Sequence, residues 1–127
     1  MSFPITRMRR MRRNETFRRM VRETRLSVDD LIMPYFVRSG SGIKKEIVSM
    51  PGNYQWSPDM LVEEAKELFD LGVPAIILFG IPDSKDPEGT SAFADDAIVS
   101  RTVELIKKEV PGLCVITDVC MCEYTDH

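Results

Sequence analysis

Three apolar segments that alternate with two amphipathic segments constrain the fold of this chain most strongly. Residues 31–37, 73–80 and 113–119 are nearly continuous apolar runs, which are typical of strands buried on both faces of a sheet. Residues 58–71 and 94–109 carry apolar side chains at helical spacing, and a glycine or a Pro-Gly pair follows each segment. This alternation predicts an α/β fold in which right-handed βαβ units surround a parallel sheet.

Local signals predict where several of the elements begin. Ser57 followed by Pro58 predicts the cap and the first residue of the helix over 58–71. Asn14 is a suitable cap for a short helix near the N-terminus, which would present a stripe of apolar side chains. Residues 46–50 are predicted to form a small strand before a turn at 51–53.

The size of the chain limits the number of closed architectures. A chain of 127 residues with 43% hydrophobic and 29% charged residues has the composition of one globular domain. Three strands do not close a barrel, and a (β/α)8 barrel takes about 250 residues. We therefore expect either an open sheet or part of a barrel.

No apolar run reaches the roughly 18 residues of a membrane span, so we expect no membrane partner, a cytoplasmic location and reduced thiols.

The net charge of -3 conceals a strong asymmetry along the chain. Residues 1–26 contain nine arginines and two glutamates, whereas the remainder has eight basic and 18 acidic residues. We expect residues 1–26 to form a basic N-terminal arm with a short helix and residues 27–127 to form the main domain. Clustered arginines also fit phosphate binding, but no aromatic residues interleave them for base stacking. An oligomerisation arm is therefore the preferred interpretation, with no nucleic-acid partner.

Cys120 and Cys122 stand one residue apart where the third apolar run should end. In a strand they would face the same way, so their sulfurs could converge on one soft metal ion, for which Zn2+ is the first choice. The alternative is a pair of incidental thiols. Asp118, Asp126 and His127 are less certain ligand candidates, since a complete site needs three or four groups. Cys114 would lie about 20 Å from Cys120 along an extended chain and is expected in the core.

Asp118 directly precedes this pair, at the expected carboxyl end of a parallel strand. Alpha/beta folds commonly carry catalytic groups at that edge of the sheet. A carboxylate that merely caps the strand is the alternative. On the predicted third strand, Cys114, Ile116, Asp118 and Cys120 share one face, and the opposite face is expected to lie under the helices.

Three segments together resemble the porphobilinogen synthase family, also called 5-aminolevulinate dehydratase. They are Thr117-Asp118-Val119-Cys120-Met121-Cys122-Glu123-Tyr124-Thr125-Asp126-His127, the run Phe79-Gly80-Ile81-Pro82, and Arg9-Arg10 leading to Asn14-Glu15. The resemblance implies a TIM (β/α)8 barrel with an N-terminal arm that wraps a neighbouring subunit, commonly in a homo-octamer. It also implies the condensation of two 5-aminolevulinate molecules to porphobilinogen with loss of two waters, as a lyase of haem biosynthesis.

The same resemblance assigns roles to particular residues. It implies that Cys120 and Cys122 are zinc ligands and that Asp118 is an active-site carboxylate that assists proton transfer or orients a substrate amine. Some family members lack the cysteines and use magnesium instead. Because both cysteines are present here, Zn2+ is the expected cofactor, with Mg2+ as the alternative or additional ion.

The resemblance further implies that this chain is the N-terminal portion of the family's protein, with three βα units of an incomplete barrel. The family's third cysteine ligand and its two Schiff-base lysines follow in a later region, which all six lysines of this chain precede. The 127-residue chain alone is therefore expected to be inactive. A non-catalytic zinc-binding assembly module is the alternative function.

Overall fold

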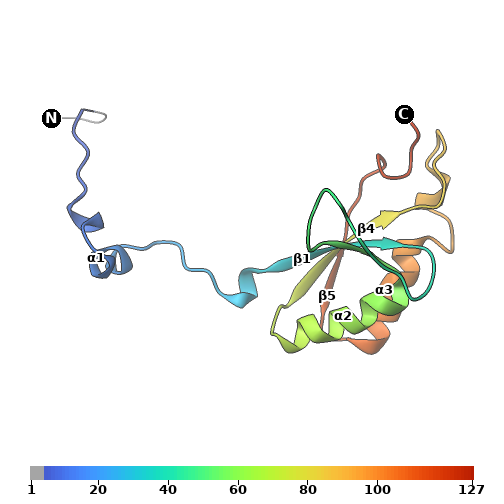
Figure 1. The fold of residues 1–127 in the computed structure, drawn as a ribbon, viewed down its shortest axis with the longest axis horizontal. Coiled ribbons are helices and arrows are strands. Elements are labelled where there is room, and N and C mark those ends of the chain that lie inside the picture. Colours follow the sequence, from blue (N-terminus) through green and yellow to red (C-terminus); the bar gives the residue numbers. More distant parts are fainter. Residues whose placement is uncertain (1–4) are drawn as a thin grey trace.

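The structure, a computed structural model, describes residues 5–127, so residues 1–4 of the expected arm lie outside the described residues. A largely parallel sheet with helices on one face forms the body of the molecule, from which the N-terminal segment extends (Figure 1). The helices are α1 (Glu15–Met20), α2 (Pro58–Asp70) and α3 (Ile98–Glu109), and the strands are β1 (Ile32–Arg38), β2 (Lys44–Glu46), β3 (Tyr54–Trp56), β4 (Ala75–Ile81) and β5 (Cys114–Thr117). Short 3-10 turns occupy η1 (Arg10–Arg12), η2 (Val28–Asp30) and η3 (Thr90–Ala92).

The predicted βαβ core is confirmed. The sheet has the order β2-β3-β1-β4-β5, and β4 lies parallel to both β1 and β5. The β1–β4 ladder runs from the pair Ile32 and Ala75 to the pair Arg38 and Ile81. Helix α2 connects β3 to β4, and α3 connects β4 to β5. The third strand is shorter than residues 113–119, and α3 begins at Ile98 instead of near residue 94.

A small strand is present, but β2 shares only Glu46 with the predicted range of residues 46–50. Strand β2 pairs antiparallel with β3, a strand that the sequence did not predict. The nonpolar contribution to this hairpin is modest, because all three residues of β2 are exposed. In addition to the backbone ladder, the Lys44 ammonium lies 4.7 Å from the ring centroid of Tyr54 and 4.5 Å from that of Trp56, which adds cation–π contacts.

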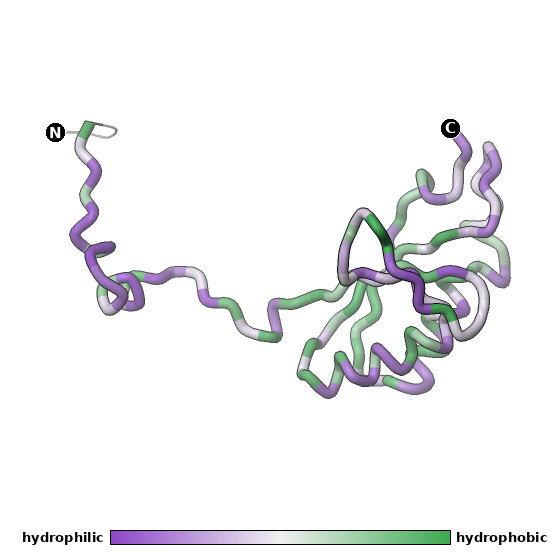
Figure 2. Tube along the Cα trace, in the orientation of Figure 1, coloured by the Kyte–Doolittle hydropathy of each residue, from purple (hydrophilic) through white to green (hydrophobic). Residues whose placement is uncertain are grey.

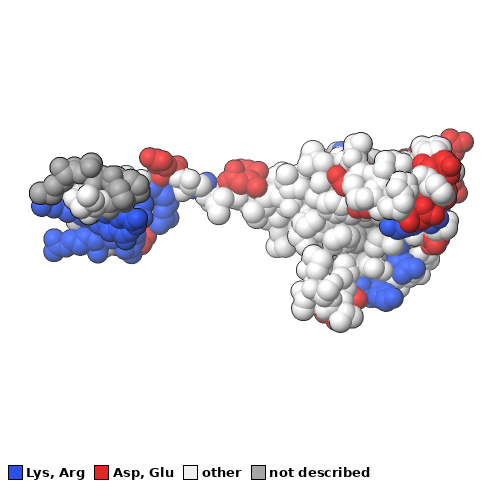
Figure 3. Space-filling view, turned by 90° about the horizontal axis from the view of Figure 1, so that it is seen from above, with Lys and Arg blue, Asp and Glu red and all other residues white. Residues whose placement is uncertain are grey.

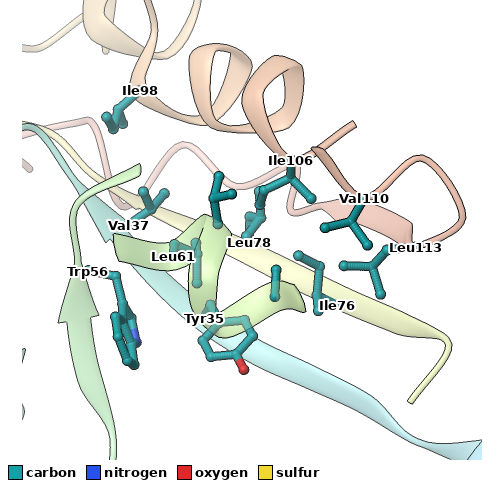
Figure 4. Close-up of a cluster of buried hydrophobic side chains, with 12 residues drawn as sticks. Tyr35, Val37, Trp56, Leu61, Ile76, Leu78, Ile98, Ile106, Val110 and Leu113 are labelled. Carbon is teal, nitrogen blue, oxygen red and sulfur yellow. The ribbon is translucent and has the colours of Figure 1, made fainter. Parts of the chain in front are cut away.

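The core lies between the sheet and helices α2 and α3. Leu61 of α2 and Ile106 of α3 are fully buried against Ile76 and Leu78 of β4 (Figure 4). Leu113, which directly precedes β5, is also fully buried. The expected helix-covered face is confirmed for the first part of this strand, where Val115 also packs against the core, whereas Thr117 and Val119 are exposed.

The opposite face of the sheet departs from the expectation that the strands are buried on both sides. Phe36 and Phe79, whose ring centroids lie 5.6 Å apart, are only half-buried on it. Pro34 on the same face of β1 is exposed. Apolar residues lie along the central strands (Figure 2) and point to both faces of the sheet. The helices of this chain cover only one of these faces.

Helix α2 begins at the predicted residue, but the hydrogen bonds around its first turn differ from the expected cap. Pro58 is the first helical residue, yet the Ser57 side chain does not cap the helix. The Ser57 hydroxyl oxygen instead accepts a hydrogen bond of 2.8 Å from the Ile43 N–H. Asp59 accepts hydrogen bonds from the Ser41 hydroxyl at 2.9 Å and the Gly42 N–H at 2.8 Å. The loop after β1 is thereby fastened to the first turn of α2.

Replacement of Asp59 by asparagine should lower the free energy of unfolding by about 1 kcal/mol at pH 7, because charge-assisted hydrogen bonds are replaced by weaker neutral ones. Hydrogen bonds from Ser57, Gly42 and Ser41 lower the pKa of Asp59 from 3.8 to about 2. The stabilisation is therefore present above pH 3.8 and disappears as the pH falls through about 2. Urea unfolding of both proteins at several pH values checks this, and a difference that persists unchanged at pH 2 contradicts it.

The N-terminal segment lies apart from the body of the protein. Asn14 caps α1 as predicted, since its side-chain oxygen accepts a 3.0 Å hydrogen bond from the Phe17 N–H. Arginine side chains gather around α1, away from the acidic groups of the body (Figure 3). Apolar side chains of this segment are also exposed, among them Ile5 (90%) and Met8 (87%). Within residues 5–127, no helix is both long and apolar enough to cross a lipid bilayer.

Candidate active site

The carboxyl ends of β1, β4 and β5 meet at one edge of the sheet because the three strands are parallel. Strand β5 ends at Thr117, and Asp118 follows it directly. The Asp118 N–H donates to the Leu78 carbonyl of β4 over 3.4 Å, which fixes the backbone of Asp118 at that edge. The Asp118 residue itself is exposed to solvent. Its carboxylate is therefore accessible to a small molecule at the position expected for a catalytic group.

The thiols of Cys120 and Cys122 converge, although for a different reason than the sequence analysis assumed. Their sulfur atoms lie 2.6 Å apart, with Cys120 half-buried and Cys122 exposed. Neither residue is in a strand, because β5 has already ended. A turn that follows the strand produces the convergence, with the Tyr124 and Thr125 N–H groups both donating to the Met121 carbonyl over 2.9 Å.

This thiol pair fits part of the ligand set of a soft divalent ion. Two sulfurs bound at about 2.3 Å to one tetrahedral ion would lie about 3.8 Å apart, so the pair, now 2.6 Å apart, would open by about 1.2 Å to hold it. The hydrogen bond with Cys120 and partial desolvation raise the pKa of the Cys122 thiol. A bound cation would offset this effect, since metal binding favours the thiolate.

The remaining ligand candidates are not gathered around the thiols. Across residues 5–127, no group of three or more His, Cys, Asp or Glu side chains is arranged to hold a metal ion. Asp126 and His127 instead face each other, with 3.7 Å between a carboxylate oxygen and Nδ1, and both are exposed. Cys114 is exposed at the start of β5, so its predicted core position is wrong. It lies on the sheet face that the helices leave uncovered.

Glu123 and Lys85 belong to this region but were missed in the sequence analysis. Burial, followed by the negative charge of Asp118, raises the pKa of the half-buried Glu123 carboxyl group, and the positive charge of Lys85 opposes this shift. The Lys85 ammonium also donates a hydrogen bond of 3.1 Å to the Cys122 carbonyl. Lys85 stands in a polar loop 37 residues before Cys122, so no local pattern indicates that the two residues meet.

A hollow of about 540 Å³ adjoins Asp118 and Cys120. Asp118 and Cys120 line it on one side, and Val99 and Val103 of α3 line it on the other. The buried ring of Tyr124 also borders it. The hollow thus combines a carboxylate, one of the two converging thiols and an apolar wall in a space large enough for a small organic molecule.

A carboxylate and a pair of soft ligands at the carboxyl edge of a parallel sheet are typical of metal-dependent α/β enzymes. Comparison with known families specifies this class further. Residues 5–127 match the sequence profile of the family described as delta-aminolevulinic acid dehydratase. The chain belongs to this family, which is a family of metalloenzymes.

Individual relatives agree with this assignment. The delta-aminolevulinic acid dehydratase of Synechocystis sp. is 57% identical over 125 residues, which are 98% of this chain and 38% of the relative. That of Methanothermus sociabilis is 52% identical over 127 residues, or 100% of this chain and 39% of the relative. The crystal structure of the Toxoplasma gondii ME49 enzyme, in complex with the reaction product porphobilinogen, superimposes with a TM-score of 0.84 at 28% identity.

The match covers nearly all of this chain but only part of each relative. The Toxoplasma alignment covers 95% of this chain and 35% of that enzyme. The present chain therefore spans between a third and two fifths of the length of these relatives. Its fold is similar to that of porphobilinogen synthase, and the thiol pair lies within the matched residues.

Proposed function

We propose that this chain contributes the metal-binding segment of a porphobilinogen synthase, which condenses two 5-aminolevulinate molecules to porphobilinogen with loss of two waters. The observation that carries the proposal is the convergence of Cys120 and Cys122 directly after Asp118, at the edge of the sheet, in a chain of this family. In this proposal the two cysteines are ligands of Zn2+, and Mg2+ is an alternative or additional ion.

The roles of the residues follow from their chemistry. A zinc ion bound there would supply a Lewis acid that polarises a substrate carbonyl. The exposed Asp118 carboxylate accepts a proton from the substrate or orients its amine. Because Asp118 and Cys120 line the same hollow, one small substrate reaches both groups.

We further propose that the sheet is the first part of a TIM barrel. Strand β1 pairs with β4 along Ile32–Arg38, but with β3 only at Phe36 and Val37. The first half of β1 therefore has a free edge on the β3 side, and β5 is the last strand on the other side. Further βα units joined at these two edges would complete a barrel and cover Phe36 and Phe79.

The basic arm, residues 1–26, is proposed to bind a neighbouring subunit of a homo-octamer, and residues 27–127 to form the barrel domain. The exposed apolar groups of the described part of the arm require a protein partner. Its nine arginines complement the acidic remainder of the chain.

A chimeric enzyme tests the function directly. In it, this chain replaces the 125 matching residues of the Synechocystis relative, which supplies the remainder of the protein. We expect the purified chimera to form porphobilinogen from 5-aminolevulinate and to bind zinc, whereas the 127-residue chain alone forms none. Light scattering on the same sample measures the size of the assembly.

The double variant Cys120→Ala, Cys122→Ala of the chimera should lose its zinc and its turnover. Cys114→Ala is the matched control, since this exposed thiol lies at the other end of β5. A chimera that is folded and zinc-loaded but inactive would contradict the proposed function. Full zinc content in the double variant would contradict the proposed ligands.

A further inference from the structure

The thiol segment leaves the sheet after Asp118 and receives support from the loop between β4 and α3. The Lys85 ammonium of this loop donates to the carbonyl of Cys122, one of the two converging cysteines, over 3.1 Å. This bond fixes the backbone at the residue whose thiol is the more exposed of the pair. A lysine on the neighbouring loop thus contacts the backbone of a thiol residue.

Backbone contacts align the same two segments. The Asp86 N–H donates to the Tyr124 carbonyl over 3.3 Å, and Asp86 forms a parallel bridge with Thr125. The Asp86 side chain accepts a 2.9 Å hydrogen bond from the Thr90 N–H, which keeps the loop folded on itself. These contacts hold the backbone next to Lys85 close to the thiol turn, where the Lys85 ammonium donates its hydrogen bond to the Cys122 carbonyl.

Gly89 allows the loop to approach this closely. Its φ of +64° lies in the left-handed region, and a Cβ atom there would lie 2.5 Å from Met121 Cε and 3.4 Å from Tyr124 Cβ. The left-handed φ favours glycine at this position, and a Cβ atom would displace the end of the flexible Met121 side chain. The loop and the thiol turn are therefore in contact at Gly89.

The charges at the site make a lysine more suitable than a neutral donor. Asp118 and Glu123 place two carboxyl groups near the thiols, and binding of a metal ion adds two thiolates. Lys85 brings a positive charge into this negative group, while its hydrogen bond holds the backbone. Outer-shell contacts of this kind orient metal ligands, and their removal typically weakens metal binding about 10–100-fold.

We propose that Lys85 is a positioning residue for the Cys120–Cys122 pair, holding the Cys122 backbone so that both sulfurs face one metal ion. The inference rests on the proposed function for the identity of the ion, but the position of the thiol turn is independent of it. Lys85 acts through the Cys122 carbonyl and does not itself bind the metal.

Two measurements on the chimera test the proposal. The first is Co2+ affinity, read from the thiolate-to-cobalt charge-transfer absorption, for Lys85→Met and Lys85→Arg. We expect affinity about 10–100-fold lower for Lys85→Met, with largely restored affinity for Lys85→Arg. The second is amide hydrogen exchange of residues 119–125 in the metal-free protein, which we expect to accelerate in Lys85→Met.

Lys107→Met is the matched control. The Lys107 ammonium also donates to backbone carbonyls, those of Pro111 at 2.7 Å and Leu113 at 2.8 Å, but at the opposite end of β5. This variant should leave cobalt affinity unchanged. Unaltered cobalt affinity in Lys85→Met, or unaltered exchange at residues 119–125, would overturn the proposal. If the unsubstituted chimera shows no thiolate-to-cobalt absorption, the proposed metal role fails, and the exchange measurement alone decides whether Lys85 holds the turn.

Discussion

Replacement of Asp118 by asparagine should lower porphobilinogen formation by the chimera about 100- to 10,000-fold, the range that general acid–base catalysis contributes. Asparagine has nearly the same shape as aspartate but cannot accept a proton at neutral pH. The Asp118 backbone bond to Leu78 does not depend on the side chain, so the strand end should keep its position. Steady-state turnover of 5-aminolevulinate is the measurement.

Asp126→Asn is the matched control for this prediction. Asp126 is an exposed carboxylate of the same segment, and it contacts His127 instead of lining the hollow. Its replacement should change turnover less than about twofold, because a surface ion pair contributes little. Zinc content should remain unchanged in both variants. Near-normal turnover in Asp118→Asn would show that this carboxylate does not take part in the reaction.

Replacement of Gly80 by alanine should lower the free energy of unfolding of the chimera by about 2 kcal/mol, the typical result of overpacking a core. Gly80 lies in β4, and an added Cβ would overlap the Tyr124 hydroxyl and lie 2.8 Å from Val99 Cγ2. Tyr124 is buried, so it cannot move away freely. Urea unfolding measures the change.

The double variant Gly80→Ala, Tyr124→Phe separates this overlap from other effects of alanine. Removal of the hydroxyl eliminates the nearest atom, whereas the contact with Val99 remains. We expect the double variant to recover part of the lost stability. Equal stability of Gly80→Ala and the unsubstituted protein would show that the sheet and the Tyr124 ring adjust without cost.

The central part of the fold was predictable because it depends on local patterns. Continuous apolar runs identified β1, β4 and β5, and helical spacing with Pro58 at its start identified α2. The β2–β3 hairpin was not predictable in this way. Its strands are three residues long, and the Lys44 contact with two aromatic rings depends on pairing across the sheet.

Part of the geometry at the proposed site was predictable from the sequence, and part of it was not. The spacing of Cys120 and Cys122 correctly indicated that the sulfurs converge, but a turn produces this geometry instead of a strand. Lys85 and Glu123 were not predicted, because their contacts with Cys122 and Asp118 form only in the folded structure. Cys114 was expected in the core because it lies too far from Cys120 to share a metal ion, yet it is exposed, since the helices cover only the other face of its strand.

The contact between the loop at residues 82–91 and the thiol turn has a consequence for loop transplantation between relatives. Because the Asp86 N–H bonds to the Tyr124 carbonyl and Gly89 lies against the Met121 side chain, the two loops form a matched pair. A graft that exchanges only one of them would separate surfaces adapted to each other. Designers who wish to change the metal preference of such an enzyme should therefore exchange both loops together.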